Sequence, residues 1–253
     1  MKIAVCLKQT FDTEAVIRID GQGQIDKSGV KMIVNPYDEY AVEEALTIGG
    51  EVVVFGVGGD ECKEALRHGL AMGANRAVLI NDAALADADH SGIALALAKA
   101  IEQEKCDMIL CGWVAIDDGA AQVPARIAEI MNIPQITVVT QLNVNGDKVE
   151  CQREGDGIAH IVEAPLPAVI SAQKGLNEPR YPTMKGIMQA KKKPIDTIDL
   201  AKLGLSADQV KAKTESTGFE LPAPRQAGKI LEGEVDQAVS QLVSLLHEEA
   251  KVV

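Results

Sequence analysis

Short apolar runs alternate with stretches of helical spacing over the first two-thirds of the chain. Each run is continuous and lacks polar alternation, which is typical of strands buried on both faces of a sheet. The apolar runs lie at residues 3–7, 52–57, 77–80 and 108–110. Helical spacing follows at residues 37–46, 60–72, 91–104 and 121–131. Because strand–helix–strand crossovers are right-handed, this order predicts an α/β fold with a doubly wound, mostly parallel sheet.

Local signals at the helix ends support these elements. Pro36 suits a first helical turn, and Asp38 and Glu39 lie where the helix dipole favours acids. We expect Asp60 to cap the second helix, and the fourth helix to stop before Pro134.

The pattern changes beyond Pro134. Alternating segments predict three strands joined through a tight hairpin turn at Asn145-Gly146, followed by a buried apolar strand. These strands are expected at residues 135–142, 148–153, 158–163 and 165–171.

The last part of the chain has a different texture. Two prolines interrupt residues 177–182, a short helix is predicted at 184–191, and residues 195–225 are polar without a periodic apolar face. An amphipathic helix is predicted at 233–251, with an apolar face of Val235, Val239, Leu242, Val243 and Leu246. We therefore divide the chain into an α/β domain at 1–173 and an arm at 174–253 that lies on another protein.

Composition narrows the function. Acids number 37 and bases 25, a net charge of −12 that disfavours nucleic acid and anionic membrane surfaces as partners. No apolar run reaches bilayer length, and the N-terminus is predicted to be a strand and not a signal, so we expect a cytoplasmic protein. The five cysteines form no CxxC and are expected to be buried free thiols, and the four histidines lack metal-ligand spacing. With one Trp, three Tyr and three Phe, the chain has few rings to stack on a flat cofactor.

Three predicted loops follow strands where an open parallel sheet binds its ligands. They are residues 6–8, 57–60 and 112–122, and the last two precede helices whose N-termini could receive a phosphate. Gly58-Gly59 could equally be only a tight turn. The absence of GxxxxGK[ST] and GxGxxG disfavours a Walker-type ATPase and a Rossmann dinucleotide site.

Asp117-Asp118 admits a catalytic or metal reading, but we favour one acid capping the helix near Ala121 and the other facing water. No GxSxG elbow and no cysteine with a neighbouring base are present. The residues therefore predict a binding domain of adenine-nucleotide size with an arm that reaches a partner.

Several strings resemble the β subunit of electron transfer flavoproteins, in order along essentially the whole chain. They are NPYDEYAVEEAL (35–46), LAMGANR (70–76), AIDD (115–118) with Gln122, LNEPRYP (176–182) and GIMQAKKKP (186–194). The resemblance implies an adenine nucleotide α-hydrolase-like fold, with the arm and last helix wrapping an α subunit that holds most of the FAD. It also implies a carrier that accepts electrons from acyl-CoA dehydrogenases in fatty acid oxidation and passes them to a membrane quinone reductase.

The resemblance further implies a second nucleotide in this chain, which is AMP in ordinary members and a second FAD in electron-bifurcating members that oxidise NADH. Asp118, Ala121, Gln122 and Val123 are expected nearest the phosphate. The full set of expected cofactor contacts is Cys6, Leu7, Asn35, Val57, Gly112, Ala115, Asp118, Gly119, Ala121, Gln122 and Val123.

The chain departs from the family pattern in this loop. Trp113-Val114 replaces a basic residue and a glutamine, whereas residues 121–123 are closer to the AQV of bifurcating members. We favour AMP because the loop is not glycine-rich enough for a pyrophosphate. A nucleotide-binding stress-type regulator is the third reading; it should have a glycine-rich phosphate loop and no arm.

The resemblance makes residues 181–188 the loop that docks dehydrogenases. Met184 is the expected anchor, with Tyr181, Ile187 and Met188 beside it. Without the family, packing of Met184 and Met188 on the protein's own surface would be preferred. The lysines at 191–193 either steer acidic partners or form a solvated helix end.

Overall fold

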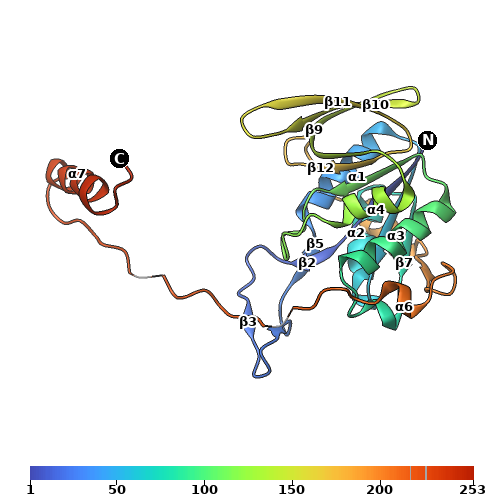
Figure 1. Cartoon of the computed structure of the whole chain (residues 1–253), viewed down its shortest axis with the longest axis horizontal. Coiled ribbons are helices and arrows are strands. Elements are labelled where there is room, and N and C mark those ends of the chain that lie inside the picture. The colour runs from blue at the N-terminus through green and yellow to red at the C-terminus, as the bar shows by residue number, and fades with distance from the viewer. Residues whose placement is uncertain (217, 226) are drawn as a thin grey trace. The chain divides into compact units, whose positions relative to one another are not determined.

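The computed structural model describes residues 1–216, 218–225 and 227–253 (Figure 1). The described chain divides into two compact units. The first comprises residues 1–17 and 26–217, and the second comprises residues 18–25 and 218–253.

In the described part of the first unit, nine strands form one sheet in the order β11-β10-β9-β12-β8-β1-β6-β7-β13. The strands from β9 through β13 in this order are parallel, and β10 and β11 extend the sheet as an antiparallel hairpin. The bounds are β1 (Lys2–Cys6), β6 (Glu51–Val57), β7 (Arg76–Ile80), β8 (Met108–Gly112), β9 (Gln135–Asn145), β10 (Lys148–Glu154), β11 (Ala159–Pro165), β12 (Val169–Ala172) and β13 (Asp196–Ile198). The predicted mostly parallel sheet is confirmed.

Helices cover both faces of this sheet, as a doubly wound fold requires. Alternate residues of β1 point to opposite faces, so that Ile3 and Val5 enter one apolar cluster and Ala4 and Cys6 the other. α1 (Pro36–Ile48), α2 (Lys63–Met72) and α5 (Met184–Lys192) contribute to the first cluster. α3 (His90–Glu104), α4 (Val123–Met131) and α6 (Ala207–Val210) contribute to the second.

The core is aliphatic, as the composition predicts. Phe55 is the largest fully buried side chain, and its cluster consists otherwise of Val, Leu, Ile, Ala and Cys residues. Cys6, Cys106, Cys111 and Cys151 are buried, Cys62 is half-buried, and all five thiols, which lie in described segments, are free. Burial raises the pKa of Cys106 and of Cys151 to about 12, so these thiols stay protonated and inert.

Shorter elements complete the two units. β2 (Gln9–Phe11) pairs with β5 (Met32–Val34) in the first unit, and 3-10 turns lie at Asp60–Cys62 and Ala83–Leu85. β3 (Arg18–Ile19) pairs with β4 (Ile25–Asp26). In the second unit α7 (Val235–Ser244) continues into a π-helical turn at Leu245–Glu249. The apolar side chains of α7 at Val235, Val239, Leu242 and Val243 are exposed, as expected for an amphipathic helix that has a partner.

Two local expectations were wrong. α2 begins at Lys63, and Asp60 lies in the preceding 3-10 turn, where its Oδ1 pairs with Lys63 Nζ at 2.7 Å instead of capping the helix. Asn145 is still in β9, paired with Lys148, so the two-residue turn is Gly146-Asp147.

Residues 174–216 pack on the first unit, beyond the boundary that we expected at residue 174. Leu200, Leu203, Leu205 and Val210 are buried in the same cluster as α3. Because these four residues are irregularly spaced and show no helical period, the sequence analysis assigned this segment to a polar arm. Among the described helices, none is both long and apolar enough to cross a bilayer.

Candidate nucleotide site and docking helix

Three neighbouring strands end at one edge of the sheet, where the cofactor contacts were expected. β8, β1 and β6 are adjacent and parallel, and they end at Gly112, Cys6 and Val57. Leu7 follows β1 and is also buried. The fold therefore brings these four predicted residues to one edge, as the switch-point rule requires.

Asn35 holds the loop that follows β8. It lies buried just before α1. Its Nδ2 donates to the carbonyl of Val114 at 3.0 Å, and its Oδ1 accepts from Ile116 N at 3.2 Å. Ala115 lies between these two contacts. The side chain of Asn35 is thus committed to the loop.

Asp38 joins three segments at this edge, and the sequence analysis missed this role. Its carboxylate accepts from Lys8 N at 2.7 Å, from Gly112 N at 3.1 Å and from Asn35 Nδ2 at 2.9 Å. Burial raises the pKa of Asp38 to about 7, although these hydrogen bonds act in the opposite direction. A Cβ at position 112 would lie 2.3 Å from Asp38 Oδ1, which explains the glycine there. The signal was available: Asn35 and Asp38 are three residues apart at a helix start, on one side of its first turn.

The two acids of the loop face a lysine. Lys8 Nζ lies 2.7 Å from Asp117 Oδ1 and 2.7 Å from Asp118 Oδ2. His90 Nε2 lies 3.1 Å from Asp118 Oδ2, and Asp118 Oδ1 accepts from Ala120 N at 2.9 Å. Burial raises the pKa of Asp118, but Lys8 and Ala120 outweigh it and hold the pKa at about 2. Neither acid caps α4, so that expectation was wrong.

The start of α4 offers free backbone donors. The helix begins at Val123 and not at Ala121, because Ala121 has a left-handed φ of 52° that the helix cannot continue. Gln122, at the N-cap, makes no capping bond within the described chain; its Oε1 accepts from Arg126 at 2.8 Å instead. The first turn, all of it described, contains no acid. An anion at residues 121–123 would meet unpaired N–H groups and the positive end of the helix dipole, so this edge fits a phosphate.

Trp113 is a packed aromatic ring at a position where the family pattern has a basic residue. Its ring meets Tyr37 edge to face, with centroids 5.8 Å apart and an interplanar angle of 82°. Among the described residues its indole N–H is buried without a hydrogen-bond partner. Trp113 therefore supports the loop by packing, and leaves one donor unused at the predicted nucleotide site.

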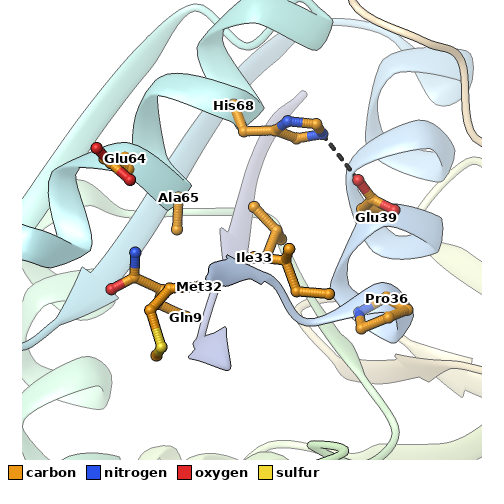
Figure 2. Close-up of a pocket in the computed structure, with 9 residues that line it drawn as sticks. Gln9, Met32, Ile33, Pro36, Glu39, Glu64, Ala65 and His68 are labelled. Carbon is orange, nitrogen blue, oxygen red and sulfur yellow. Dashed lines mark ion pairs between the residues drawn. The ribbon is translucent and has the colours of Figure 1, made fainter. Parts of the chain in front are cut away.

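A separate cavity of about 350 Å³ opens between the β2–β5 pair and the starts of α1 and α2 (Figure 2). His68 Nε2 and Glu39 Oε1, 2.8 Å apart, connect the two helices across it. The predicted nucleotide contacts are not among its lining residues, which are Gln9, Met32, Ile33, Val34, Pro36, Glu39, Glu64, Ala65 and His68.

The expected docking residues are exposed. Tyr181 is 94% exposed, Met184 76%, Met188 62% and Ile187 37%. Met184 and Met188 therefore do not pack on the protein's own surface, which was the alternative. Thr183 Oγ1 accepts from Gly186 N at 3.0 Å and caps α5, which fixes where this apolar surface begins.

The segment before α5 is anchored on α1. Arg180 binds Glu43 through two bonds of 2.7 Å, and these bonds lower the pKa of Glu43. Asn177 Nδ2 donates to Tyr40 O at 3.0 Å and to Glu44 Oε2 at 2.8 Å. Burial raises the pKa of Glu44.

The end of α5 is anchored on α2. Arg67 donates to the carbonyls of Ala190 and Lys193, and Lys193 Nζ donates to Ala74 O at 2.6 Å. A Cβ at Gly186 would lie 2.5 Å from Ala71 O, so α5 and α2 approach closely there. The exposed apolar side chains thus stand on a helix fixed at both ends. Of the basic run, Lys193 is engaged, whereas Lys191 and Lys192 are exposed.

Comparison with known proteins decides the family. The model of the electron transfer flavoprotein domain matches residues 22–203. The electron transfer flavoprotein subunit beta of Bacillus subtilis is 43% identical over 258 residues that cover both chains completely. The proteins of the same name from Syntrophomonas wolfei and Bos taurus are 43% and 37% identical, over 100% and 90% of this chain and 98% and 91% of their own lengths. The chain belongs to the electron transfer flavoprotein β-subunit family.

This membership confirms the resemblance that the sequence strings indicated. An electron transfer flavoprotein β subunit has an α subunit as its partner, and the family binds flavin and nucleotide. All five strings that carry the resemblance, between residues 35 and 194, lie in the first unit. The match favours this family over the stress-type regulator.

Proposed function

We propose that this chain is the β subunit of a cytoplasmic, heterodimeric electron carrier. With its α subunit it accepts electrons from acyl-CoA dehydrogenases on FAD and passes them to a quinone reductase at the membrane. The observation that carries this proposal is the exposed methionine pair of α5, Met184 and Met188, on a helix anchored at both ends. Methionine is unbranched and polarizable, so it suits a surface that must accept several partners.

We further propose that AMP binds at the edge formed by β8, β1 and β6. Its phosphate would lie at the N–H groups of Ala121, Gln122 and Val123, with Gly119 beside them. Two observations support this: the uncapped start of α4, and Lys8, which pairs with both Asp117 and Asp118 and offsets part of their negative charge. Asp118 is engaged by Lys8 and His90, so we assign it the role of shaping the loop and not of touching the phosphate.

FAD, when bound, supplies the redox chemistry of the heterodimer. This chain contributes binding and docking surfaces: the arm and α7 contact the α subunit, and α5 contacts the dehydrogenase. The exposed apolar face of α7 and the aliphatic composition agree with a flavin that is held mainly by the other subunit.

A second candidate is an electron-bifurcating subunit that binds a second FAD at the same edge and oxidises NADH. Residues 121–123 favour it, since Ala-Gln-Val is the string of bifurcating members. We rank it below AMP because the loop has few glycines.

The docking proposal is tested with Met184→Ala in the purified heterodimer. Burial of a methionine side chain contributes about 1.5–3 kcal/mol, so reduction of FAD by an acyl-CoA dehydrogenase should be ~10-fold less efficient. FAD content should be unchanged. Lys185→Ala, an exposed neighbour on the same helix, is the matched control, and Met184→Leu should restore the rate. Equal rates for Met184→Ala and the parent would refute the docking role.

A further inference from the structure

His90 is the first residue of α3 and contacts the loop after β8 through Asp118. Its Nε2 lies 3.1 Å from Asp118 Oδ2, the same oxygen that Lys8 Nζ meets at 2.7 Å. Both side chains are about one-third exposed, at 33% for His90 and 35% for Asp118. The loop is therefore fixed to the start of α3 as well as to the strand that precedes Lys8.

The residue before His90 binds a second segment. Asp89 Oδ1 caps α3 by accepting from Ser91 N at 2.9 Å and Gly92 N at 3.2 Å. Asp89 Oδ2 accepts from Lys213 N at 2.8 Å and from Thr214 N at 3.1 Å. The Ser91 hydroxyl, which donates to Oδ1 at 2.5 Å, and the backbone N–H groups of Lys213, Gly92 and Ser91 hold the pKa of the Asp89 carboxyl well below its usual range, so Asp89 stays charged and keeps these hydrogen bonds at neutral pH.

The same segment packs tightly on α3. A Cβ at Gly92 would lie 2.2 Å from the carbonyl oxygen of Val210, and Val210 itself is fully buried. The backbone at 210–214 thus crosses the first turn of α3 without room for a side chain between them. This stretch lies near the C-terminal end of the first unit, before the chain continues into the second unit at residue 218.

We propose that His90 is a positioning residue for the nucleotide loop and, through its neighbour Asp89, ties that loop to residues 213–214, close to the C-terminal end of the first unit. The proposal rests on nucleotide binding at this edge, as proposed above. An occupied loop holds Asp118 in one place, Asp118 holds the His90 ring, and the backbone of His90 fixes the cap that binds Lys213 and Thr214. Because coupling is reciprocal, any interaction that orders residues 213–214 also strengthens nucleotide binding.

The first test measures AMP affinity by calorimetry on the full chain. Loss of one partly exposed, charge-assisted hydrogen bond in His90→Ala should weaken AMP binding by about three- to tenfold. His90→Gln keeps a donor for Asp118 and should recover most of the affinity. His160→Ala, a substitution of an exposed histidine on β11, is the matched control and should not change it.

The second test reads the coupling itself by hydrogen exchange at the N–H groups of Lys213 and Thr214. In the parent chain, saturating AMP should slow exchange there, and His90→Ala should abolish this response while His90→Gln keeps it. A merely structural role would speed exchange equally with and without AMP. The same AMP response in His90→Ala as in the parent would overturn the coupling alone. A parent chain that binds no AMP would overturn the proposed AMP site, and with it this inference.

Discussion

Asp38 organises the nucleotide edge as a single buried carboxylate. It receives N–H groups from the end of β8, from the residues after β1 and from Asn35, and Gly112 leaves it the space to do so. The sequence placed this acid in the first turn of α1, where helix-dipole reasoning gave it no further role. Its spacing from Asn35 was a local signal, but its burial depends on Gly112 at the end of β8, 74 residues later in the chain, and local spacing does not contain that contact.

The buried state of Asp38 predicts a pH dependence of stability. Its pKa is about 7 in the folded chain and near 3.8 when unfolded, so the folded state binds the proton more tightly. Stability from this group is present at low pH and is lost as the pH rises through 4 toward 7. Between pH 5 and 8 the parent should lose on the order of 2 kcal/mol of unfolding free energy relative to Asp38→Asn. Urea titrations of both chains at these two pH values measure it, and a difference that does not change with pH would show that Asp38 is already ionised at pH 5.

At the scale of elements, the regular part of the fold followed from periodicity. The strands of the parallel sheet and helices α1, α3, α4 and α5 lie within a few residues of their predicted ranges, because each has either a continuous apolar run or a helical apolar face. β13, one of the parallel strands, and α6 were missed, since they have only three and four residues and are too short to show a period. Helix α4 begins at Val123 and not at Ala121 because Ala121 has a left-handed φ, and the sequence gives no reason to expect this conformation at an alanine.

Arg67 anchors the C-terminal end of helix α5. Arg67 binds the carbonyls at the end of α5, so Arg67→Met, which keeps the apolar stem, should destabilise the unit by about 1–2 kcal/mol. Exchange of the α5 amide hydrogens should accelerate more than that of α3. Lys99→Met removes a surface pair within α3 and serves as the control. Unaltered exchange in α5 would mean that its contact with α2 holds without Arg67.

At the scale of the whole molecule, the first unit carries both proposed sites and the second presents an unpartnered amphipathic helix. The sequence indicated an arm from residue 174, but residues 174–216 complete the first unit, with Leu200, Leu203 and Val210 in its core. The division into a nucleotide domain and a docking arm thus remains a functional proposal whose compact boundary lies near residue 217.

Two truncations separate these boundaries. Removing residues 218–253 should leave a cooperatively folding chain that no longer co-purifies with the α subunit, since this truncation removes α7, the proposed contact surface. Removing residues 174–253 should expose the core beneath Leu200 and Val210 and give an unstable chain. Thermal unfolding and co-purification of both truncations decide this, and a chain without residues 218–253 that still binds the α subunit would contradict the role of the arm.

The central claim is that this chain binds its own nucleotide at the edge of β8, β1 and β6 while the flavin belongs mainly to the partner. Purifying the heterodimer, denaturing it and counting the released nucleotides tests this most directly. We predict one FAD and one AMP per heterodimer. Two FAD would assign the edge to a second flavin and support the bifurcating candidate, and one FAD with no second nucleotide would contradict the claim that this edge is a nucleotide site.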